Sequence, residues 1–262
     1  MSAATIEAAA RVLRTIPIAA AYQPRAAAQQ AANCTTCHLR DLCLPCGMNE
    51  IDTGRLDALM FARRRIKAGQ ILYHEGDRFA FLYAVRSGTF KSNLTLPDGR
   101  EQVTGFHIAG ELMGLDGVAQ GNHASTATAL EDTEICAIPY AQLCELAQGS
   151  AGMQQLVTRL MSRELVREHS LMLLLGSMNS EERLAAFLLN LSRRYKARGY
   201  SASEFHLRMS RAEIGSYLGL TLETVSRTFS SFQQQGLLEV DKRHIRILDL
   251  VAFTASFEIR LH

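Results

Sequence analysis

The sequence has no tryptophan, only five prolines and almost no excess of charge, with a formal net charge of +2. No apolar run approaches the ~18–20 residues that a membrane-spanning helix needs, so we expect no membrane partner. Arg11, Arg14 and Arg25 lie in an alanine-rich stretch, but no compact apolar core with a cleavage site follows them. We therefore expect no secretory signal and a cytoplasmic location. A chain of 262 residues can form one or two domains with a substantial core.

Charge is unevenly distributed along the chain. From Arg183 to Arg246 there are 11 Lys and Arg residues against 5 Asp and Glu, a net charge of +6, which leaves −4 for the rest. A basic C-terminal region indicates a polyanionic partner, and a merely solvated surface is the alternative.

Four of the six cysteines lie within thirteen residues. Cys34, Cys37, Cys43 and Cys46 follow the spacing C-x2-C-x5-C-x2-C. In a chain without a signal peptide such a cluster is typical of a metal or iron–sulfur site rather than of disulfides. Cysteines can also be small buried hydrophobes, which suits Cys144 on a predicted short helix, but the residues between the first four are polar.

The N-terminal two thirds of the chain is predicted to contain a barrel behind a cysteine-rich segment. We expect a flexible or loosely helical leader over 1–33, the cysteine cluster with a short helix over 34–60, and an antiparallel β-roll over 61–150. In the last segment short apolar or alternating runs are separated by recurring glycines. The predicted strands are Gln70–Tyr73, Phe79–Arg86, Thr89–Leu96, Gln102–Ile108 and Thr126–Ile138, and the predicted helices are Asn49–Met60 and Tyr140–Gln148.

A long helix is predicted within residues 151–178, from Gly152 to Leu175 with Gly176 as its stop. It has two apolar stripes. The first, which we expect to face the barrel, contains Met153, Val157, Leu160, Leu171 and Leu174. The second has coiled-coil spacing and predicts a homodimer seam made of Met161, Leu165, Glu168, Met172 and Leu175.

The seam has one charged residue, Glu168. In a parallel dimer two such carboxylates would approach each other, at a cost on the order of 1 kcal/mol. Glu168 either turns outward or keeps the dimer marginal, so that a second input decides assembly. A helix buried twice within one monomer is the alternative to dimerisation.

Residues 179–262 are predicted to form a winged helix-turn-helix. Ser210 and Glu213 have capping-box spacing, and Gly219 and Thr221 mark the end of one helix and the cap of the next. The predicted elements are helices Glu181–Arg198, Arg211–Leu218 and Leu222–Gln235, followed by a hairpin of Leu237–Val240 and His244–Leu248.

The second short helix has side chains suited to reading DNA bases near its start. Arginine binds guanine through two hydrogen bonds, glutamate accepts from cytosine and serine is adaptable, and these types are present as Arg227, Glu223 and Ser226. A helical hairpin used only for packing is the alternative, which the basic surroundings and the predicted wing disfavour.

A β-roll, a long helix and a winged helix-turn-helix in this order resemble the CRP/FNR superfamily of bacterial transcription regulators, over residues 34–250. Residues 82–89, 105–110, 181–187 and 218–227 are similar to the FNR, oxygen-responsive type. The resemblance implies an α+β fold, a homodimer on palindromic TTGAT-like promoter sites, base reading by Glu223, Ser226 and Arg227, and contact with RNA polymerase through β-roll loops. Thr95–Gln102 is the candidate loop.

Cyclic AMP is not an expected ligand. A cyclic-nucleotide pocket of this superfamily needs an Arg-Ser pair after its Gly-Glu-Leu, so that the phosphate is neutralised. The chain has Gly110-Glu111-Leu112, but no arginine lies between Glu101 and Ser150.

The FNR pattern implies instead a 4Fe–4S cluster held by Cys34, Cys37, Cys43 and the distant Cys136, with oxygen or nitric oxide as the signal. Leu42 and Leu44 flank Cys43 and would shield the cluster. Cys46 departs from the pattern, so a local tetrathiolate of Cys34, Cys37, Cys43 and Cys46, such as a zinc knuckle, is the alternative.

Nothing in the sequence predicts an enzyme. There is no nucleophile elbow, P-loop or His-Glu-x-x-His. His74, His107 and His123 in the barrel region leave a cupin-like metal enzyme as a remote alternative, in which the helix-turn-helix would have no role.

Overall fold

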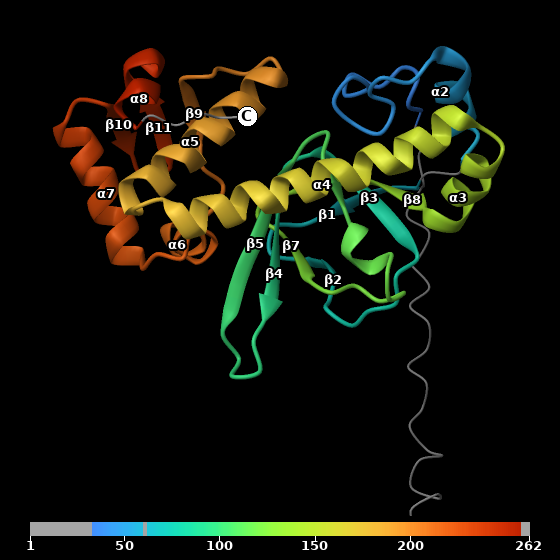
Figure 1. Ribbon diagram of the computed structural model, residues 1–262, viewed down its shortest axis with the longest axis horizontal. Coiled ribbons are helices and arrows are strands. Elements are labelled where there is room, and N and C mark those ends of the chain that lie inside the picture. The colour runs from blue at the N-terminus through green and yellow to red at the C-terminus, as the bar shows by residue number, and fades with distance from the viewer. Residues whose placement is uncertain (1–32, 60–61, 258–262) are drawn as a thin grey trace, which may run out of the picture.

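The computed structural model describes residues 33–59 and 62–257, so the leader predicted for residues 1–33 lies outside the described residues except for Asn33. Along the chain, a short helix is followed by a β-rich region, a long helix and a C-terminal domain (Figure 1). The elements are α2 (Glu50–Asp57), β1 (Ala62–Ile66), β2 (Ile71–Tyr73), β3 (Phe81–Ser87), β4 (Thr89–Thr95), β5 (Glu101–Ile108), β6 (Leu112–Met113), the 3-10 turn η1 (Leu115–Gly117), β7 (Thr126–Ala129), β8 (Thr133–Pro139), α3 (Tyr140–Gln148), α4 (Ala151–Ser177), α5 (Ser180–Ala197), β9 (Glu204–His206), α6 (Arg211–Leu218), α7 (Leu222–Gln234), β10 (Leu238–Asp241), β11 (His244–Ile247) and α8 (Leu250–Ser256).

The β-rich region consists of two four-stranded antiparallel sheets, ordered β1-β8-β3-β6 and β2-β7-β4-β5. Alternate side chains of each strand point to opposite faces. Tyr83 and Val85 of β3 and Ile135 and Ala137 of β8 therefore share a core with Phe90 of β4, between the two sheets. The predicted antiparallel β-roll is confirmed.

The outer face of the first sheet forms a second core with the neighbouring helices. Leu82 and Ala84 of β3 and Ile138 of β8 pack there with Leu143 of α3 and Leu156 of α4. Leu44, buried to 1% exposure, brings the cysteine-rich segment into the same core. This placement sets residues 33–48 over the face of β8 that contains Cys136.

Helix α4 runs from the cysteine-rich segment at one end of the molecule to the C-terminal domain at the other (Figure 1). Its buried stripe is Met153, Leu156, Leu160 and Leu174, so Leu156 rather than the expected Val157 is the fully buried residue at that turn. The predicted seam lies on a more open face. Leu165 is 60% and Met172 61% exposed, Glu168 is exposed, and Met161 and Leu175 are half-buried.

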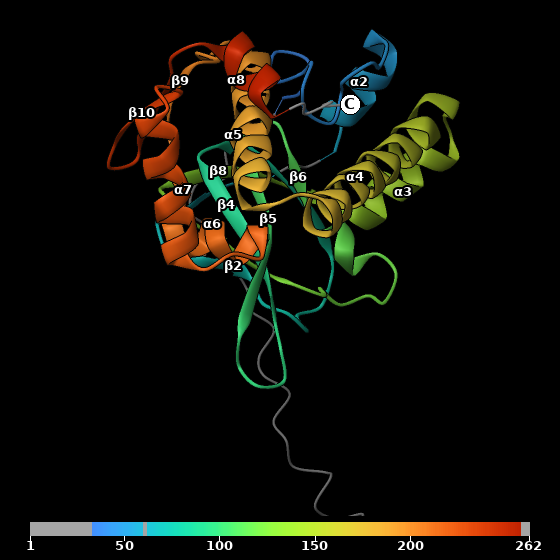
Figure 2. The same ribbon diagram turned by 60° about the vertical axis from the view of Figure 1, so that its left-hand side comes forward.

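The C-terminal domain packs its own core around α5. Leu184 and Leu188 of α5, Ile214 of α6, Phe229 of α7 and Ile245 of β11 are all buried. The core also takes in Val103 and Phe106 of β5, so this domain is packed on the β-roll (Figure 2). The α+β class with a β-roll, a long helix and a winged helix-turn-helix is confirmed.

Four local expectations were wrong or incomplete. The run Thr126–Ile138 is two strands, β7 and β8, which belong to different sheets. Strand β1 was missed because it contains three arginines in five residues. Gly176 lies inside α4, which ends one residue later, and the helix expected over Asn49–Met60 is the shorter α2, with Asn49 as its cap. Among the described residues, none of the helices is long and apolar enough to cross a membrane.

Candidate cluster site and DNA-binding surface

Residues 33–48 form a chain of tight turns that places the first cysteines close together. Backbone hydrogen bonds run from Cys37 N to Cys34 O (3.2 Å), from Cys43 N to Leu39 O (2.9 Å) and from Cys46 N to Cys43 O (3.1 Å). The carboxylate of Asp57, at the end of α2, accepts from the backbone N–H groups of Cys34 and Thr35. These bonds fix the start of the segment on α2.

Cys136 comes to this segment from the sheet. It lies opposite Arg63 of β1 and Ala84 of β3, and it shares the outward face of β8 with Ile138. Cys34, Cys43 and Cys136 all pack against the core that holds Leu44. Residues about a hundred positions apart thus meet at one place.

The thiols of Cys34, Cys37, Cys43 and Cys136 lie close enough to influence one another's ionisation. Burial, followed by the charges of Cys43, Asp57, Cys136 and Cys37, raises the pKa of Cys34 well above its usual value. Burial, together with the charges of Cys136, Cys37 and Cys46, raises the pKa of Cys43 to about 12, although a backbone hydrogen bond from Leu44 opposes it. Burial also raises the pKa of Cys136, although the Arg86 cation opposes it. Four thiolates cannot coexist here unless a cation compensates them.

The cysteine side chains are not arranged as the coordination sphere of a metal. Within residues 33–59 and 62–257, no three His, Cys, Asp or Glu side chains meet in a metal-binding arrangement, and all six cysteines are free thiols. The set of four mutually close thiols nevertheless has the donor chemistry that an iron–sulfur cluster requires.

Two arginines of the sheet lie beside these thiols. Arg63 is opposite Cys136, and its Nε is buried without a hydrogen-bond partner among the described residues. Arg86 of β3 points Nη1 at the Cys37 thiol, 4.0 Å away, and forms an ion pair with Glu134. A buried donor without an acceptor is unfavourable, so the Arg63 Nε indicates that an electronegative group belongs next to Cys136. Sequence reasoning missed both arginines.

Cys46 and Cys144 have other neighbours. The Cys46 thiol accepts from Arg163 Nη2 of α4 (3.4 Å), and its carbonyl accepts from Arg159 Nη1 (3.1 Å). Cys144 is half-buried on α3. Cys46 is therefore fastened to α4, unlike the cysteines that pack against the sheet.

The helix-turn-helix is set by local caps, as expected. Ser210 and Glu213 form a capping box at the start of α6, Gly219 ends that helix at φ 63°, and Thr221 accepts from Thr224 N to cap α7. A left-handed backbone with no Cβ penalty is what glycine provides at a helix end. Sequence reasoning found these residues because each cap depends only on its neighbours.

Helix α7 buries one face and opens the other. Val225, Phe229 and Phe232 face the domain core, whereas Glu223 and Arg227 are exposed and Ser226 is half-buried. The open face thus presents the side chains expected to read bases.

Basic residues lie at the start of α6 and in the β10–β11 turn. The Arg211 guanidinium lies 3.5 Å from the centre of the Phe229 ring, and burial and the Arg243 charge lower its pKa to about 10. Arg243 and Lys242 lie in the β10–β11 turn, and Arg211 Nη2 donates to the Lys242 carbonyl. These cations suit phosphate contacts on either side of a DNA groove.

The C-terminal domain is joined to the β-roll by a group of ion pairs. Arg194 and Arg198 of α5 donate to the two oxygens of Glu111, at 2.6 Å and 2.8 Å. Burial opposes ionisation of this carboxyl, but the two guanidinium groups outweigh it and lower the pKa of Glu111. Nearby, Lys91 of β4 pairs with Glu213 of α6 (2.9 Å). No sequence signal connects Glu111 with residues 83 and more positions away.

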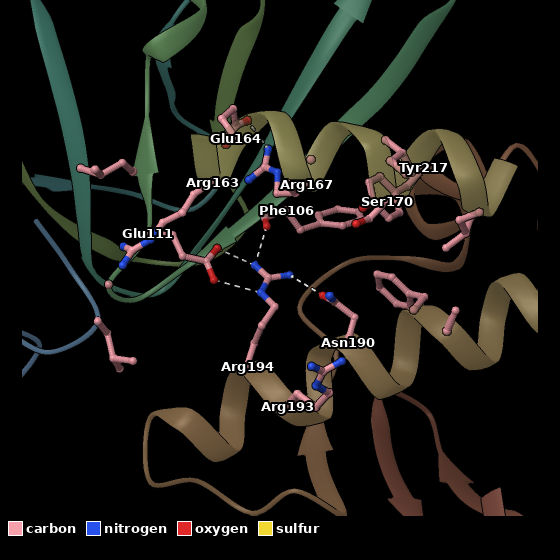
Figure 3. Close-up of a pocket in the computed structure, with 18 of the residues that line it drawn as sticks. Phe106, Glu111, Arg163, Glu164, Arg167, Ser170, Asn190, Arg193, Arg194 and Tyr217 are labelled. Carbon is pink, nitrogen blue, oxygen red and sulfur yellow. Dashed lines mark hydrogen bonds and ion pairs between the residues drawn. The ribbon is translucent and has the colours of Figure 1, made fainter. Parts of the chain in front are cut away.

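Two cavities lie beside α4. The larger, of about 420 Å³, lies between α4, α5 and the end of β5, and Figure 3 shows Arg163 and Arg167 entering it from α4 while Arg194 reaches Glu111 from α5. The smaller, of about 220 Å³, lies within the β-roll and is lined by Asp116, Ala124 and Ser125.

A β-roll joined to a winged helix-turn-helix whose α7 exposes Glu223 and Arg227 defines a DNA-binding transcription regulator. Family models agree with this class. The cyclic nucleotide-binding domain matches residues 63–150, and the Crp-like helix-turn-helix domain matches residues 182–255.

Similar proteins of known name and one similar solved structure identify the family. The chain is 48% identical to the transcriptional regulatory protein btr of Bordetella pertussis, over 84% of this chain and 91% of that one. It is 45% identical to the transcriptional activator protein FnrA of Stutzerimonas stutzeri (87% and 93%) and 45% identical to the fumarate and nitrate reduction regulatory protein of Escherichia coli (83% and 87%). The structure of FixK2 from Bradyrhizobium japonicum superposes with a TM-score of 0.70 at 32% identity, covering 75% of this chain and 97% of that one. The chain belongs to the CRP/FNR superfamily, and its relatives include FNR-type regulators.

Proposed function

We propose that the protein is an oxygen-responsive transcription regulator in which Cys34, Cys37, Cys43 and Cys136 hold a 4Fe–4S cluster. The observation that carries the proposal is the packing of Cys34 and Cys43 from the loop against the same core as Cys136 of the sheet, beside the unpartnered Arg63 Nε. The similarity to FnrA and to the fumarate and nitrate reduction regulatory protein agrees with the FNR-type resemblance on which the cluster assignment rests.

The residues fit such a group by donor type and by charge. Four thiolates bind one iron each, and a cluster with four thiolates has a net negative charge that Arg63 and Arg86 would meet. When bound, the cluster supplies a link between these thiolates that oxygen or nitric oxide can destroy. Leu44, buried against the sheet, and Leu42 flank Cys43 and limit access of solvent.

A zinc knuckle of Cys34, Cys37, Cys43 and Cys46 is the second candidate, with another effector. The structure favours the first set, because the Cys46 thiol accepts from Arg163 on α4 whereas Cys136 packs in the same core as Cys34 and Cys43. The effector of a zinc protein would have to act elsewhere in the barrel.

Ligation would reach the DNA-binding domain through direct contacts. Leu42 packs on Gly110, where an added Cβ would lie 3.1 Å from the Leu42 Cβ. The next residue, Glu111, binds Arg194 and Arg198 of α5. When Cys43 and Cys136 are no longer held together, the position of Leu42 against Gly110 is no longer fixed, and the anchor of α5 on the β-roll changes with it.

Ligation would also govern dimerisation through α4. Cys46 is bonded to Arg159 and Arg163 of this helix, so ordering of the loop orders the helix beside it. We propose that two copies pair through Met161, Leu165, Glu168, Met172 and Leu175, with Glu168 keeping the homodimer weak. A dimer would place two α7 helices on successive half-sites of a palindrome.

Cyclic AMP does not fit the β-roll cavity. The Asp116 carboxylate accepts there from Ala124 N (3.0 Å), Ser125 N (2.9 Å) and Ser125 Oγ (2.7 Å), and from His123. The donors around this carboxylate are already bonded to it, and a phosphate placed beside it would be repelled by its charge. RNA polymerase remains the proposed partner of the Thr95–Gln102 loop, which projects at the β4–β5 turn (Figure 1).

Fluorescence anisotropy tests the proposal on labelled duplex DNA with TTGAT half-sites. For the chain purified without oxygen we expect tight binding, at least about tenfold weaker after exposure to air, and no comparable change on a scrambled duplex. Cys46→Ser should behave as the wild type does. Equal affinity before and after air would overturn the proposal.

A further inference from the structure

The large cavity between α4, α5 and β5 has a chemistry that the proposed cluster does not use. It is lined by five arginines and two glutamates. The cations are Arg163, Arg167, Arg193, Arg194 and Arg198, and the anions are Glu111 and Glu164. Like charges gathered in a half-enclosed space favour binding of an anion.

The two glutamates of the cavity serve three of these arginines. Glu111 is shared between Arg194 and Arg198, and Glu164 forms an ion pair with Arg167 (3.0 Å). Arg163 Nη2 donates to the Cys46 thiol, at 3.4 Å, and to no carboxylate among the bonds described. Burial raises the pKa of Glu164 although Arg167 opposes it, which weakens the negative charge on this wall further.

The rest of the lining is largely apolar and aromatic. Phe106, Phe187 and Tyr217 form a group with ring centres 5.3 to 6.0 Å apart, and Leu112, Leu115 and Leu171 line other walls. A volume of about 420 Å³ lies in the range of small-molecule sites, which are mostly apolar with a few placed polar groups and lie preferentially between domains.

We propose that this cavity binds a small organic anion, with a carboxylate, sulfonate or phosphate group on an apolar ring-bearing body. The anionic group would lie beside Arg163 and Arg167 of α4 (Figure 3), and the ring against the aromatic group. Such a ligand would contact the β-roll, α4 and the DNA-binding domain at once, beside Leu42 and Cys43, which also line the cavity.

Binding is tested with 8-anilinonaphthalene-1-sulfonate, an apolar aromatic anion whose fluorescence rises in apolar sites. The full-length chain is titrated free of iron, so the result does not depend on the cluster. We expect saturable binding with one site per chain. Arg163→Gln and Arg167→Gln together should weaken it at least about tenfold, or ~1.4 kcal/mol, whereas Arg100→Gln on the exposed β4–β5 turn should not.

Blocking the cavity gives a second test that leaves its charge intact. Ser170 lines the cavity, so Ser170→Trp should abolish binding, whereas Ser162→Trp on an exposed position of the same helix should not. Circular dichroism confirms that each variant is folded. Binding that survives Ser170→Trp, or that Ser162→Trp reduces equally, would place the dye on the open face of α4 and overturn the proposal.

Discussion

The regions at the two ends of α4 differ in how completely the described residues satisfy their polar groups. At the DNA-binding end, the caps of α6 and α7 are bonded to their own neighbours, and the core around α5 is buried, with Val103 and Phe106 of the β-roll included in it. At the cysteine end, burial raises the pKa of Cys34 and Cys43, and the Arg63 Nε has no acceptor among the described residues. The first region has the structure of a complete DNA-binding domain. The second has the structure of a site that needs a bound cation.

If the DNA-binding domain is already complete, its specificity for DNA sequence should depend on single side chains. Arg227→Ala should weaken specific binding to a TTGAT palindrome by ~1–3 kcal/mol, about fivefold to 150-fold, because a bidentate base contact is lost. Gln234→Ala, at the exposed far end of α7, should have little effect. Anisotropy titrations at fixed salt measure both. An Arg227→Ala protein with unchanged discrimination between specific and scrambled DNA would contradict the assignment.

This first prediction rests on the part of the fold that sequence reasoning describes best. Capping residues predict both helices of the helix-turn-helix, because a cap is recognised within four residues. They are Ser210, Glu213 and Gly219 for α6 and Thr221 for α7. By contrast, the turn between β7 and β8 contains Leu130, Glu131 and Asp132 without glycine or proline, so the two strands look like one. Tertiary pairings such as Glu111 with Arg194 leave no local trace at all.

The same limit applies to the cysteine end. The spacing of Cys34, Cys37, Cys43 and Cys46 indicates a metal site but leaves the fourth ligand open, and Cys136 enters only through resemblance. The structure adds the position of Cys136 on the outward face of β8 and the fastening of Cys46 to α4. Both depend on sheet register and helix packing, which single-residue patterns do not encode.

A substitution in the middle of α4 tests how the two regions are connected, because this part of the helix joins them. Glu168→Leu removes a pair of facing carboxylates from the proposed seam and should tighten the dimer by ~1 kcal/mol or more, about five- to tenfold, even without the cluster. Sedimentation equilibrium of the iron-free chain measures the change. Ser162→Leu adds the same apolar side chain at an exposed position outside the seam and serves as control. Equal dimerisation of both variants would show that the seam lies elsewhere.

The smallest effect is expected at the junction between the β-roll and α5. Arg194 and Arg198 lower the pKa of Glu111 against the opposing effect of burial, so its ion pairs stabilise the fold above the unfolded pKa near 4.5. That stability is lost as the pH falls through the folded value. The difference in melting temperature between the wild type and Glu111→Gln should therefore be largest near neutral pH and shrink below about pH 4.5.

Melting curves of the iron-free chain between about pH 3 and pH 7 measure this difference. A difference that stays constant across the range would show that Glu111 acts through packing rather than through its charge.

The central claim is that Cys136 completes a cluster site with Cys34, Cys37 and Cys43. Iron, sulfide and zinc analysis of protein purified without oxygen tests it most directly, with Cys136→Ser and Cys46→Ser beside the wild type. We predict about four iron and four sulfide per chain in the wild type and in Cys46→Ser, and loss of both in Cys136→Ser. Zinc in place of iron, retained in Cys136→Ser and lost in Cys46→Ser, would contradict the account.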